Sequence, residues 1–254
     1  MIIDTHSHVY LPEFDADRAE MLSGAENEGI ELILMPAIDS QTHSVMLQTE
    51  QEFKGACLSM MGLHPCSVKE AYKNELKTVS AYFEKRQFIA VGETGLDFYW
   101  DRTFTKEQYE AFQIQIGLAL QYDIPVVIHS RNSIDECIKV ISENQQGNLK
   151  GVFHCFSGNI EQSRQIIDLG FHLGIGGVVT FKNSGLDKVL ADLDMKNIVL
   201  ETDAPYLAPV PFRGKRNECS YLKYVAEKLS EIKNVSKKEI ENVTTDNAKR
   251  LFNL

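Results

Sequence analysis

Eight short apolar runs, rich in β-branched residues, recur along the chain, and longer segments with helical periodicity separate them. Successive runs start roughly 20 to 36 residues apart, which leaves room for one strand and one helix each time. This alternation predicts βα units that build a parallel sheet. The expected strands are Met1–Thr5, Glu31–Met35, Leu58–Gly62, Phe88–Gly92, Pro125–His129, Gly151–His154, Phe171–Ile175 and Asn197–Glu201.

The helical segments fill the intervals and continue to the end of the chain. At 254 residues and with no Gly/Ser linker or charge block, the chain predicts one domain spanning residues 1–254. Its length suits a (β/α)8 barrel, although a doubly wound open sheet gives similar local signals. Ser236 and Glu239 predict a capped helix start. The expected helices are Arg18–Glu28, Ser67–Lys85, Lys106–Tyr122, Ile134–Glu143, Ile160–Leu169, Tyr221–Ser230 and Lys237–Leu251.

The positions of polar residues decide between the closed barrel and the open sheet, because these residues directly follow the expected strands. Catalytic residues of a barrel enzyme gather at the carboxyl ends of its strands. Six of the eight runs end in histidine or in a carboxylate residue. His6 and His8 are two positions apart, so their side chains point the same way if the strand continues through them. The residues at the strand ends are His6, His8, His64, Glu93, His129, His154 and Asp203. The sequence therefore predicts an α/β fold, a single (β/α)8 TIM barrel with a metal site at the C-terminal end of its strands.

The remaining two of the seven histidines serve as controls. His43 lies in a helical stretch, and His172 lies near the start of a strand, at the end opposite the predicted site. Both are expected to be structural or exposed. Five of the seven histidines fall at strand ends, and two carboxylates join them there. Ligand binding explains this pattern better than core packing does.

Imidazole and carboxylate donors without thiolates suit zinc, manganese, iron or, in an open site rich in carboxylates, magnesium. The five cysteines are scattered and form no C-x-x-C pair, so reduced thiols are expected. The proposed ligands are the strand-end histidines and carboxylates without His64, and six ligands are too many for one tetrahedral ion. Two ions that share one carboxylate would use them all, and such a pair is suited to displacement at a phosphate ester.

With these motifs the chain resembles the TatD-like metal-dependent deoxyribonucleases of the amidohydrolase superfamily, over nearly its whole length. Cys66 and Cys219 depart from the family pattern, where His and Pro are common, and neither departure removes a proposed ligand. The motifs are Asp4-Thr5-His6-Ser7-His8, Gly62-Leu63-His64-Pro65, Gly92-Glu93-Thr94-Gly95-Leu96-Asp97, Ile128-His129-Ser130-Arg131, Phe153-His154-Cys155-Phe156-Ser157-Gly158, Glu201-Thr202-Asp203-Ala204-Pro205-Tyr206 and Arg213-Gly214-Lys215-Arg216-Asn217.

The resemblance implies two divalent metal ions, Mg²⁺, Zn²⁺ or Mn²⁺. One would be held by His6, His8 and Asp203 and the other by His129 and His154, with Glu93 bridging them. It also implies a deoxyribonuclease, 3′-exonuclease-like, in which an activated water attacks a phosphodiester and Asp203 accepts its proton. His64 resembles the family's phosphate-contacting or acid-base histidine, although a structural role in a His-Pro turn is the alternative.

Other residues near these motifs are expected to support the site. The segment 204–217 should lie over the barrel mouth and bring Arg213, Lys215 and Arg216 near a bound phosphate, with the two arginines preferred because a guanidinium grips phosphate bidentately. Solvated loop charges are the alternative. Asp4, expected to face the interior, and Asp97 and Glu201 are interpreted as groups that orient ligands. The aromatic run Phe98-Tyr99-Trp100 would either stack on exposed bases or pack on itself.

The formal charge of −10 argues against broad adhesion to nucleic acid and favours short or single-stranded 3′ ends of DNA as partners. No signal peptide or membrane span is evident, which predicts a cytoplasmic protein, and no obligate protein partner is evident. The alternative function is hydrolysis of a small amide, lactone or phosphoester. It is disfavoured because many such relatives bridge their metals with a carboxylated lysine, and Gly92–Gly95 and Ile128–Arg131 contain none. Binding without turnover is a third hypothesis.

Overall fold

A computed structural model describes residues 2–254 of the chain. Within these residues eight strands alternate with helices, as expected; Met1, expected in the first strand, lies outside the described part. The strands are β1 (Ile2–Asp4), β2 (Ile30–Met35), β3 (Cys57–Ser59), β4 (Val91–Asp97), β5 (Val126–Arg131), β6 (Gly151–Phe153), β7 (His172–Ile175) and β8 (Ile198–Leu200).

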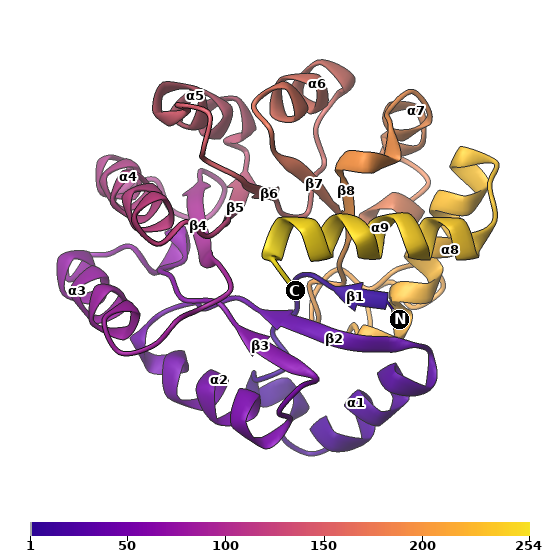
Figure 1. Ribbon diagram of the computed structural model, residues 1–254, viewed down its shortest axis with the longest axis horizontal. Helices are drawn as coiled ribbons and strands as arrows, with labels where there is room; N and C mark the ends of the chain where they lie inside the picture. Colours follow the sequence, from indigo (N-terminus) through magenta and orange to yellow (C-terminus); the bar gives the residue numbers. More distant parts are fainter. Residues whose placement is uncertain (1) are drawn as a thin grey trace.

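Every pair of neighbouring strands is parallel, and the strands form two arcs, β1-β2-β3 and β4-β5-β6-β7-β8. Met61 and Val91 join the arcs on one side through a parallel bridge. On the other side, the Thr5 amide donates to the Leu200 carbonyl over 3.0 Å, and the Asp203 amide donates to the His6 carbonyl over 2.9 Å. The strands thus surround a common axis (Figure 1). The predicted (β/α)8 barrel is confirmed.

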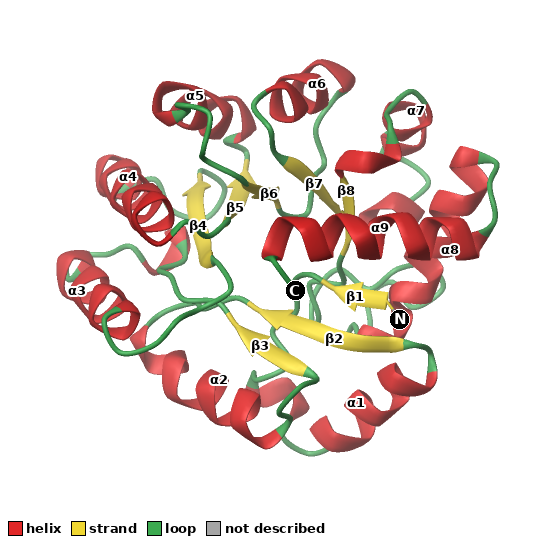
Figure 2. Cartoon of the chain, in the orientation of Figure 1, coloured by secondary structure: helices red, strands yellow, loops and turns green. Residues whose placement is uncertain are grey.

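Helices surround the ring of strands (Figure 2). None of the helices in the described part is long and apolar enough to cross a membrane. The helices are α1 (Arg18–Asn27), α2 (Ser40–Glu52), α3 (Tyr72–Phe83), α4 (Thr105–Tyr122), α5 (Ile134–Asn144), α6 (Ile160–Asp168), α7 (Leu186–Ala191), α8 (Leu222–Lys233) and α9 (Lys237–Phe252).

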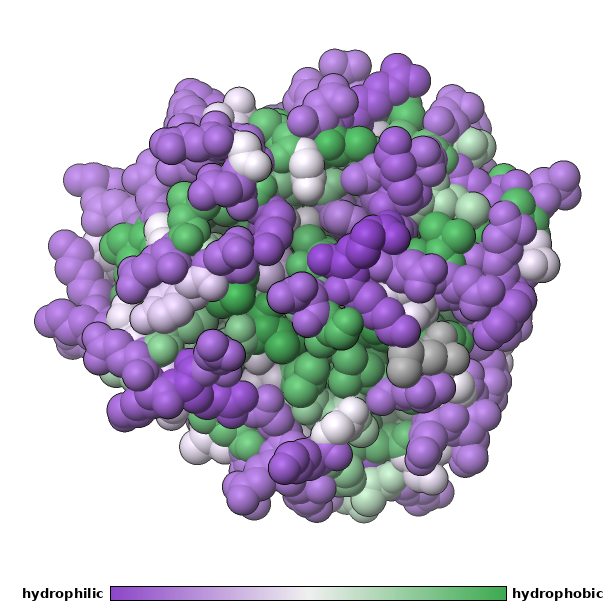
Figure 3. Space-filling model, viewed as in Figure 1, coloured by the Kyte–Doolittle hydropathy of each residue, from purple (hydrophilic) through white to green (hydrophobic). Residues whose placement is uncertain are grey.

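Helix α9 crosses one end of the barrel, toward the viewer in Figure 1. Its Leu251 and Phe252 pack on an apolar cluster that takes residues from most of the strands, including Ile3, Leu34, Val127, Val152 and Val199. Phe252 also lines a small hollow with Pro125 and Lys150, which directly precede β5 and β6. This is therefore the end where strands begin. Hydrophilic side chains cover most of this face, with apolar ones near its centre (Figure 3).

Strand β4 differs most from the sequence expectation. It was expected at Phe88–Gly92 and instead runs from Val91 to Asp97. Its second half is polar and contains Gly95, whose φ is 128° and where a Cβ atom would lie 2.1 Å from the His129 carbonyl oxygen. The strand therefore needs glycine there to approach β5. Hydrophobic periodicity missed it because this part of the barrel interior holds polar groups.

Candidate metal centre

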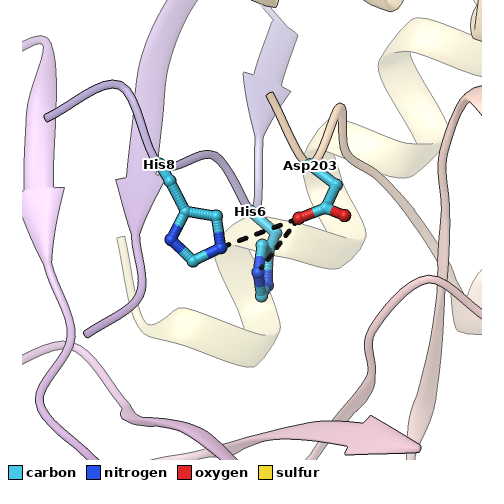
Figure 4. A group of neighbouring side chains, drawn as sticks. All are labelled: His6, His8 and Asp203. Atoms are coloured by element: carbon cyan, nitrogen blue, oxygen red, sulfur yellow. Dashed lines mark ion pairs between the residues drawn. The ribbon is translucent and has the colours of Figure 1, made fainter. Parts of the chain in front are cut away.

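The histidines and carboxylates expected at strand ends meet at the end of the barrel opposite α9. His6 and His8 follow β1, and Asp203 follows β8. Their side chains point toward one another (Figure 4). Nε2 of His6 and Nε2 of His8 lie 3.8 and 3.7 Å from the same oxygen, Oδ1 of Asp203. Both histidines lie beyond the end of β1, so the loop after the strand, not the strand itself, brings the two rings together.

Glu93 lies at the centre of the cluster, and its two oxygens face different histidines. Oε2 lies 3.1 Å from His6 Nε2 and 3.6 Å from His8 Nε2. Oε1 lies 2.8 Å from His129 Nδ1, 3.4 Å from His64 Nε2 and 4.0 Å from His154 Nε2. This placement suits a carboxylate shared between two ligand groups.

His154 lies between the histidines that face Oε2 of Glu93 and those that face Oε1. Its ring stacks on that of His6 with centroids 3.4 Å apart, and its Nε2 is 3.7 Å from Asp203 Oδ1. His64, Glu93 and His129 form another group, whose possible ligand atoms lie within 4.8 Å of one another. The expected pairing of His129 with His154 around a second ion stays a prediction.

Two buried carboxylates each contact a histidine at the ring nitrogen that is not the one nearest Glu93. Asp97 Oδ2 lies 2.8 Å from Nε2 of His129, and Glu201 Oε1 lies 2.9 Å from Nδ1 of His154. Glu201 fits because residue 174 in β7 is glycine: a Cβ atom there would lie 2.2 Å from its carboxylate oxygen. Such contacts fix the orientation of an imidazole and raise its basicity. These are the orienting positions expected from the sequence.

Asp4 bonds a ligand residue as expected, but through the backbone amide of His6 and not through its ring. It follows Ile3, whose side chain packs in the interior cluster, so alternation places Asp4 on the other face of β1. Its carboxylate accepts hydrogen bonds from the Thr202 side chain over 2.6 Å and from the His6 amide over 3.3 Å. It joins the loops after β1 and β8 without touching a ligand ring.

Tyr10 is a supporting residue that the sequence reasoning missed. Its hydroxyl lies 3.1 Å from Nδ1 of His8 and donates to the Pro36 carbonyl over 2.7 Å. The only available signal was its place two residues after His8. A tyrosine in that position has no motif that distinguishes it from a core aromatic.

Burial dominates the electrostatics of the centre. It lowers the pKa values of His6, His8 and His154, and for His6 and His8 the neighbouring imidazoles add to this effect. Neutral imidazole is the form that binds a metal. Burial raises the pKa of Asp203 to about 7. Burial also opposes charge on Glu93, but the facing histidines prevail and hold its pKa well below the usual range.

His129 and His64 are the exceptions among the imidazoles. Burial opposes their charge, yet hydrogen bonds to Asp97 and Glu93 raise the pKa of His129 to about 9. Glu93 likewise raises the pKa of His64. Nδ1 of His64 accepts a hydrogen bond from the Cys66 amide over 3.0 Å, while its Nε2 faces Glu93. The two roles considered for His64 are therefore compatible, because one ring nitrogen shapes the turn and the other faces the centre.

The donor set fits divalent cations. Both ring nitrogens of His6 are buried and lack a hydrogen-bond partner in the described part of the chain, although Nε2 lies 3.1 Å from Glu93 Oε2. A cation bound by both the imidazole nitrogen and the carboxylate would satisfy these two groups, which are close together but not aligned for a hydrogen bond. Cys155 adjoins His154 and Glu201, but burial holds the pKa of its thiol well above the usual range, which disfavours the thiolate that would bind a metal.

The two arginines expected at the phosphate differ in their surroundings. Arg216 is bound on several sides: it donates to Asp17 over 2.6 and 2.8 Å, to Glu218 over 3.1 Å and to the Glu13 carbonyl over 2.7 Å. These bonds use the donors that a phosphate would need. Arg213 is exposed, with its guanidinium 4.5 Å from the centre of the Phe181 ring. Of the two arginines, Arg213 is the one that forms no ion pair with a carboxylate of the described residues.

Residues 3–253 match the family model of the TatD related DNases. The chain belongs to the TatD family. It is 35% identical to the "uncharacterized metal-dependent hydrolase YabD" of Bacillus subtilis, and the match covers 100% of both chains. It is also 29% identical to the "3′-5′ ssDNA/RNA exonuclease TatD" of Pantoea ananatis, with 95% of each covered.

The fold agrees with a solved TatD structure. The crystal structure of YjjV, a TatD homologue from Escherichia coli, superposes with a TM-score of 0.94 at 30% identity, covering 100% of this chain and 98% of that one. The predicted family is thus confirmed, and with it the assignment as a metal-dependent hydrolase. The histidine and carboxylate cluster of this TatD chain could hold a metal ion.

Proposed function

We propose that the chain removes nucleotides from the 3′ ends of single-stranded DNA by phosphodiester hydrolysis. His6, His8 and Asp203 would hold one divalent ion and His129 and His154 a second, with Glu93 between them. The observation that carries this proposal is the position of Glu93, whose two oxygens face different sets of imidazoles. When bound, two such ions activate water and stabilise the attacking and leaving oxygens of a phosphate ester.

The residues of the chain supply the proton transfers. Asp203 has a pKa raised to about 7 by burial, so its carboxylate can accept a proton from water near neutral pH. His64, whose pKa Glu93 raises, can carry a proton on Nε2 and donate a hydrogen bond to a phosphate or leaving oxygen. Asp97 and Glu201 keep His129 and His154 oriented during these steps.

Two observations support a single-stranded end as the substrate. A relative from Pantoea ananatis bears the name of a single-strand exonuclease. The formal net charge of −10 argues against broad electrostatic adhesion to duplex DNA. Arg131, two residues after His129, and Arg213, in the segment that follows Asp203, are exposed cations that suit contact with one short strand.

The test is digestion of 5′-labelled single-stranded DNA by metal-loaded protein, with Mg²⁺, Mn²⁺ and Zn²⁺ compared. Wild type should release mononucleotides from the 3′ end. Glu93→Ala and Asp203→Ala should lose more than about a hundredfold in rate, beyond the 10- to 100-fold typical for groups that only orient ligands. His172→Gln, at the opposite end of the barrel, is the matched histidine control and should retain the rate.

Two other results would overturn the proposal. Turnover of small amides, lactones or phosphoesters without release of mononucleotides would assign the centre to another branch of hydrolases. Intact metal binding without turnover of any of these substrates would indicate a binding protein.

A further inference from the structure

Two large aromatic side chains are exposed in the loop between β4 and α4. Trp100 is 68% exposed and Tyr99 is 52% exposed. Their rings meet edge to face, with centroids 4.9 Å apart. Arg131, at the end of β5, lies with its guanidinium 3.8 Å from the centre of the Tyr99 ring. We call these three residues the aromatic rim. Exposed aromatics held this way, instead of being buried, mark a contact surface.

The aromatic rim is attached to the metal centre by one carboxylate. Oδ1 of Asp97 accepts the backbone N–H groups of Tyr99 and Trp100 over 2.9 and 3.1 Å. Oδ2 of the same carboxylate lies 2.8 Å from His129. Arg131 follows His129 by two residues in β5. The rim therefore has a fixed position at the edge of the centre and is held from two adjacent strands.

The charge on Arg131 remains available to a ligand. No carboxylate of the described residues lies within ion-pair distance of its guanidinium, and its neighbours are the rings of Tyr99 and Trp100, at 3.8 and 5.2 Å. Aromatic faces beside an unpaired arginine are the combination that binds unpaired bases, because a base stacks on the rings while the cation attracts the adjacent phosphate. A base inside a duplex keeps its faces covered and cannot use such a surface.

We propose that the aromatic rim stacks a nucleobase of the single strand whose terminal phosphodiester lies at the metal centre. This inference rests on the proposed function and adds a substrate-positioning site to it. Trp100 and Tyr99 hold the strand in place and take no part in bond cleavage. The site gives the chain a physical reason to prefer unpaired ends.

Trp100 itself reports on the stacking, because it is the only tryptophan in the chain. A short phosphorothioate-linked thymidine oligomer, which resists hydrolysis, is titrated into the metal-loaded protein while tryptophan fluorescence is followed. Stacking of thymine on the indole should quench the fluorescence. An abasic oligomer with the same number of phosphates should leave it nearly unchanged. Equal quenching by both oligomers, or by neither, would overturn the proposal.

The kinetic test uses the same comparison of substrates. For DNA with a complete 3′ end, Trp100→Ala should lower kcat/KM by roughly tenfold, mainly through KM, as expected for the loss of one base–aromatic contact. For DNA with abasic nucleotides at the 3′ end, wild type and variant should differ by less than about twofold, because no base is left to stack. Trp100→Phe should restore most of the rate on complete DNA.

Ile114→Ala is the control, since this exposed apolar residue lies on α4 beside α3 and outside the rim. It should match wild type on both substrates. If Trp100→Ala lowers the rate equally on complete and abasic DNA, the residue is structural and the proposal fails. If the chain hydrolyses no DNA yet thymine alone quenches Trp100, stacking stands and the proposed nuclease activity falls. The two failures are thus distinguishable.

Discussion

The position of Glu93 shows how a single residue organises the centre. A buried carboxylate costs free energy unless cations or hydrogen bonds compensate for its lost hydration. Here five histidines lie within 4.0 Å of its two oxygens. Because burial and mutual repulsion keep several of these imidazoles neutral, divalent ions are the natural source of the missing positive charge.

Asp97 is expected to matter through His129. Asp97→Asn keeps the shape of the side chain but removes the charge that faces His129 Nε2 over 2.8 Å. We predict a 10- to 100-fold loss in affinity for Mn²⁺, roughly the effect of mutating a group that orients a metal ligand. The measurement is calorimetric titration of metal into metal-free protein.

The matched control for Asp97 lies in the loop that follows it. Asp101 pairs with Lys69 over 2.8 Å at the surface and touches no ligand. Asp101→Asn should therefore bind metal like wild type. Equal losses in the two variants would show that the loop, and not the contact with His129, sets the affinity.

His172 supplies a pH-dependent contribution to stability at the other end of the barrel. Burial, with help from Arg250, lowers its pKa from 6.5 to about 4, and its buried Nδ1 has no hydrogen-bond partner in the described part. Between these two pH values the unfolded chain binds the additional proton. The free energy of unfolding therefore falls as the pH drops from 6.5 to 4.

Replacing His172 removes this penalty. The difference in the free energy of unfolding between His172→Gln and wild type should grow by about 3 kcal/mol in favour of the variant as the pH falls from 7.5 to 4, measured by urea unfolding across that range. The groups of the metal centre titrate in both proteins and cancel in the difference. Parallel stability curves for the two proteins would contradict the assignment.

At the scale of elements, α9 was predicted well and β4 was not. The Ser236 side chain accepts the Glu239 amide as expected, and the helix begins at Lys237 as expected. Helix starts obey local rules that one sequence displays. The position of β4 depends instead on tertiary contacts. Its second half is polar, and Gly95 allows the strand to approach the His129 carbonyl of β5. Periodicity fails at a strand whose interior residues serve chemistry.

The cap of α9 offers a test of that element. Ser236→Ala should lower the free energy of unfolding by about 1 kcal/mol, the usual cost of losing an N-cap. The hydrolysis rate at 25 °C should stay unchanged, because α9 closes the end of the barrel far from the centre. Unfolding in urea measures the first effect.

Thr78→Ala in α3 is the comparison for the cap. Its hydroxyl bonds the Asn74 carbonyl within the helix and caps nothing, so the change should stay within about 0.5 kcal/mol. A loss of activity in Ser236→Ala at constant stability would indicate that α9 influences the centre.

At the scale of the whole molecule, the sequence predicted the barrel and which residues meet at the candidate centre, but not which histidine faces which oxygen of Glu93. The assignment of these residues to two metal ions stays a prediction. Eight alternating units and polar strand ends are visible in one sequence. Which histidine faces which oxygen of Glu93 depends on the meeting of segments from both ends of the chain. Asp4 illustrates this, since it joins the loops after β1 and β8 through Thr202 and not through a ligand ring.

Closure of the barrel is thus a condition for the centre, because His6 and His8 follow its first strand and Asp203 follows its last. The most direct test is anomalous diffraction from crystals of the protein grown with Mn²⁺. We predict two peaks, one on each side of Glu93, with the first contacting His6, His8 and Asp203 and the second contacting His129 and His154. A single peak, or a peak that does not contact Glu93, would contradict this account of the centre.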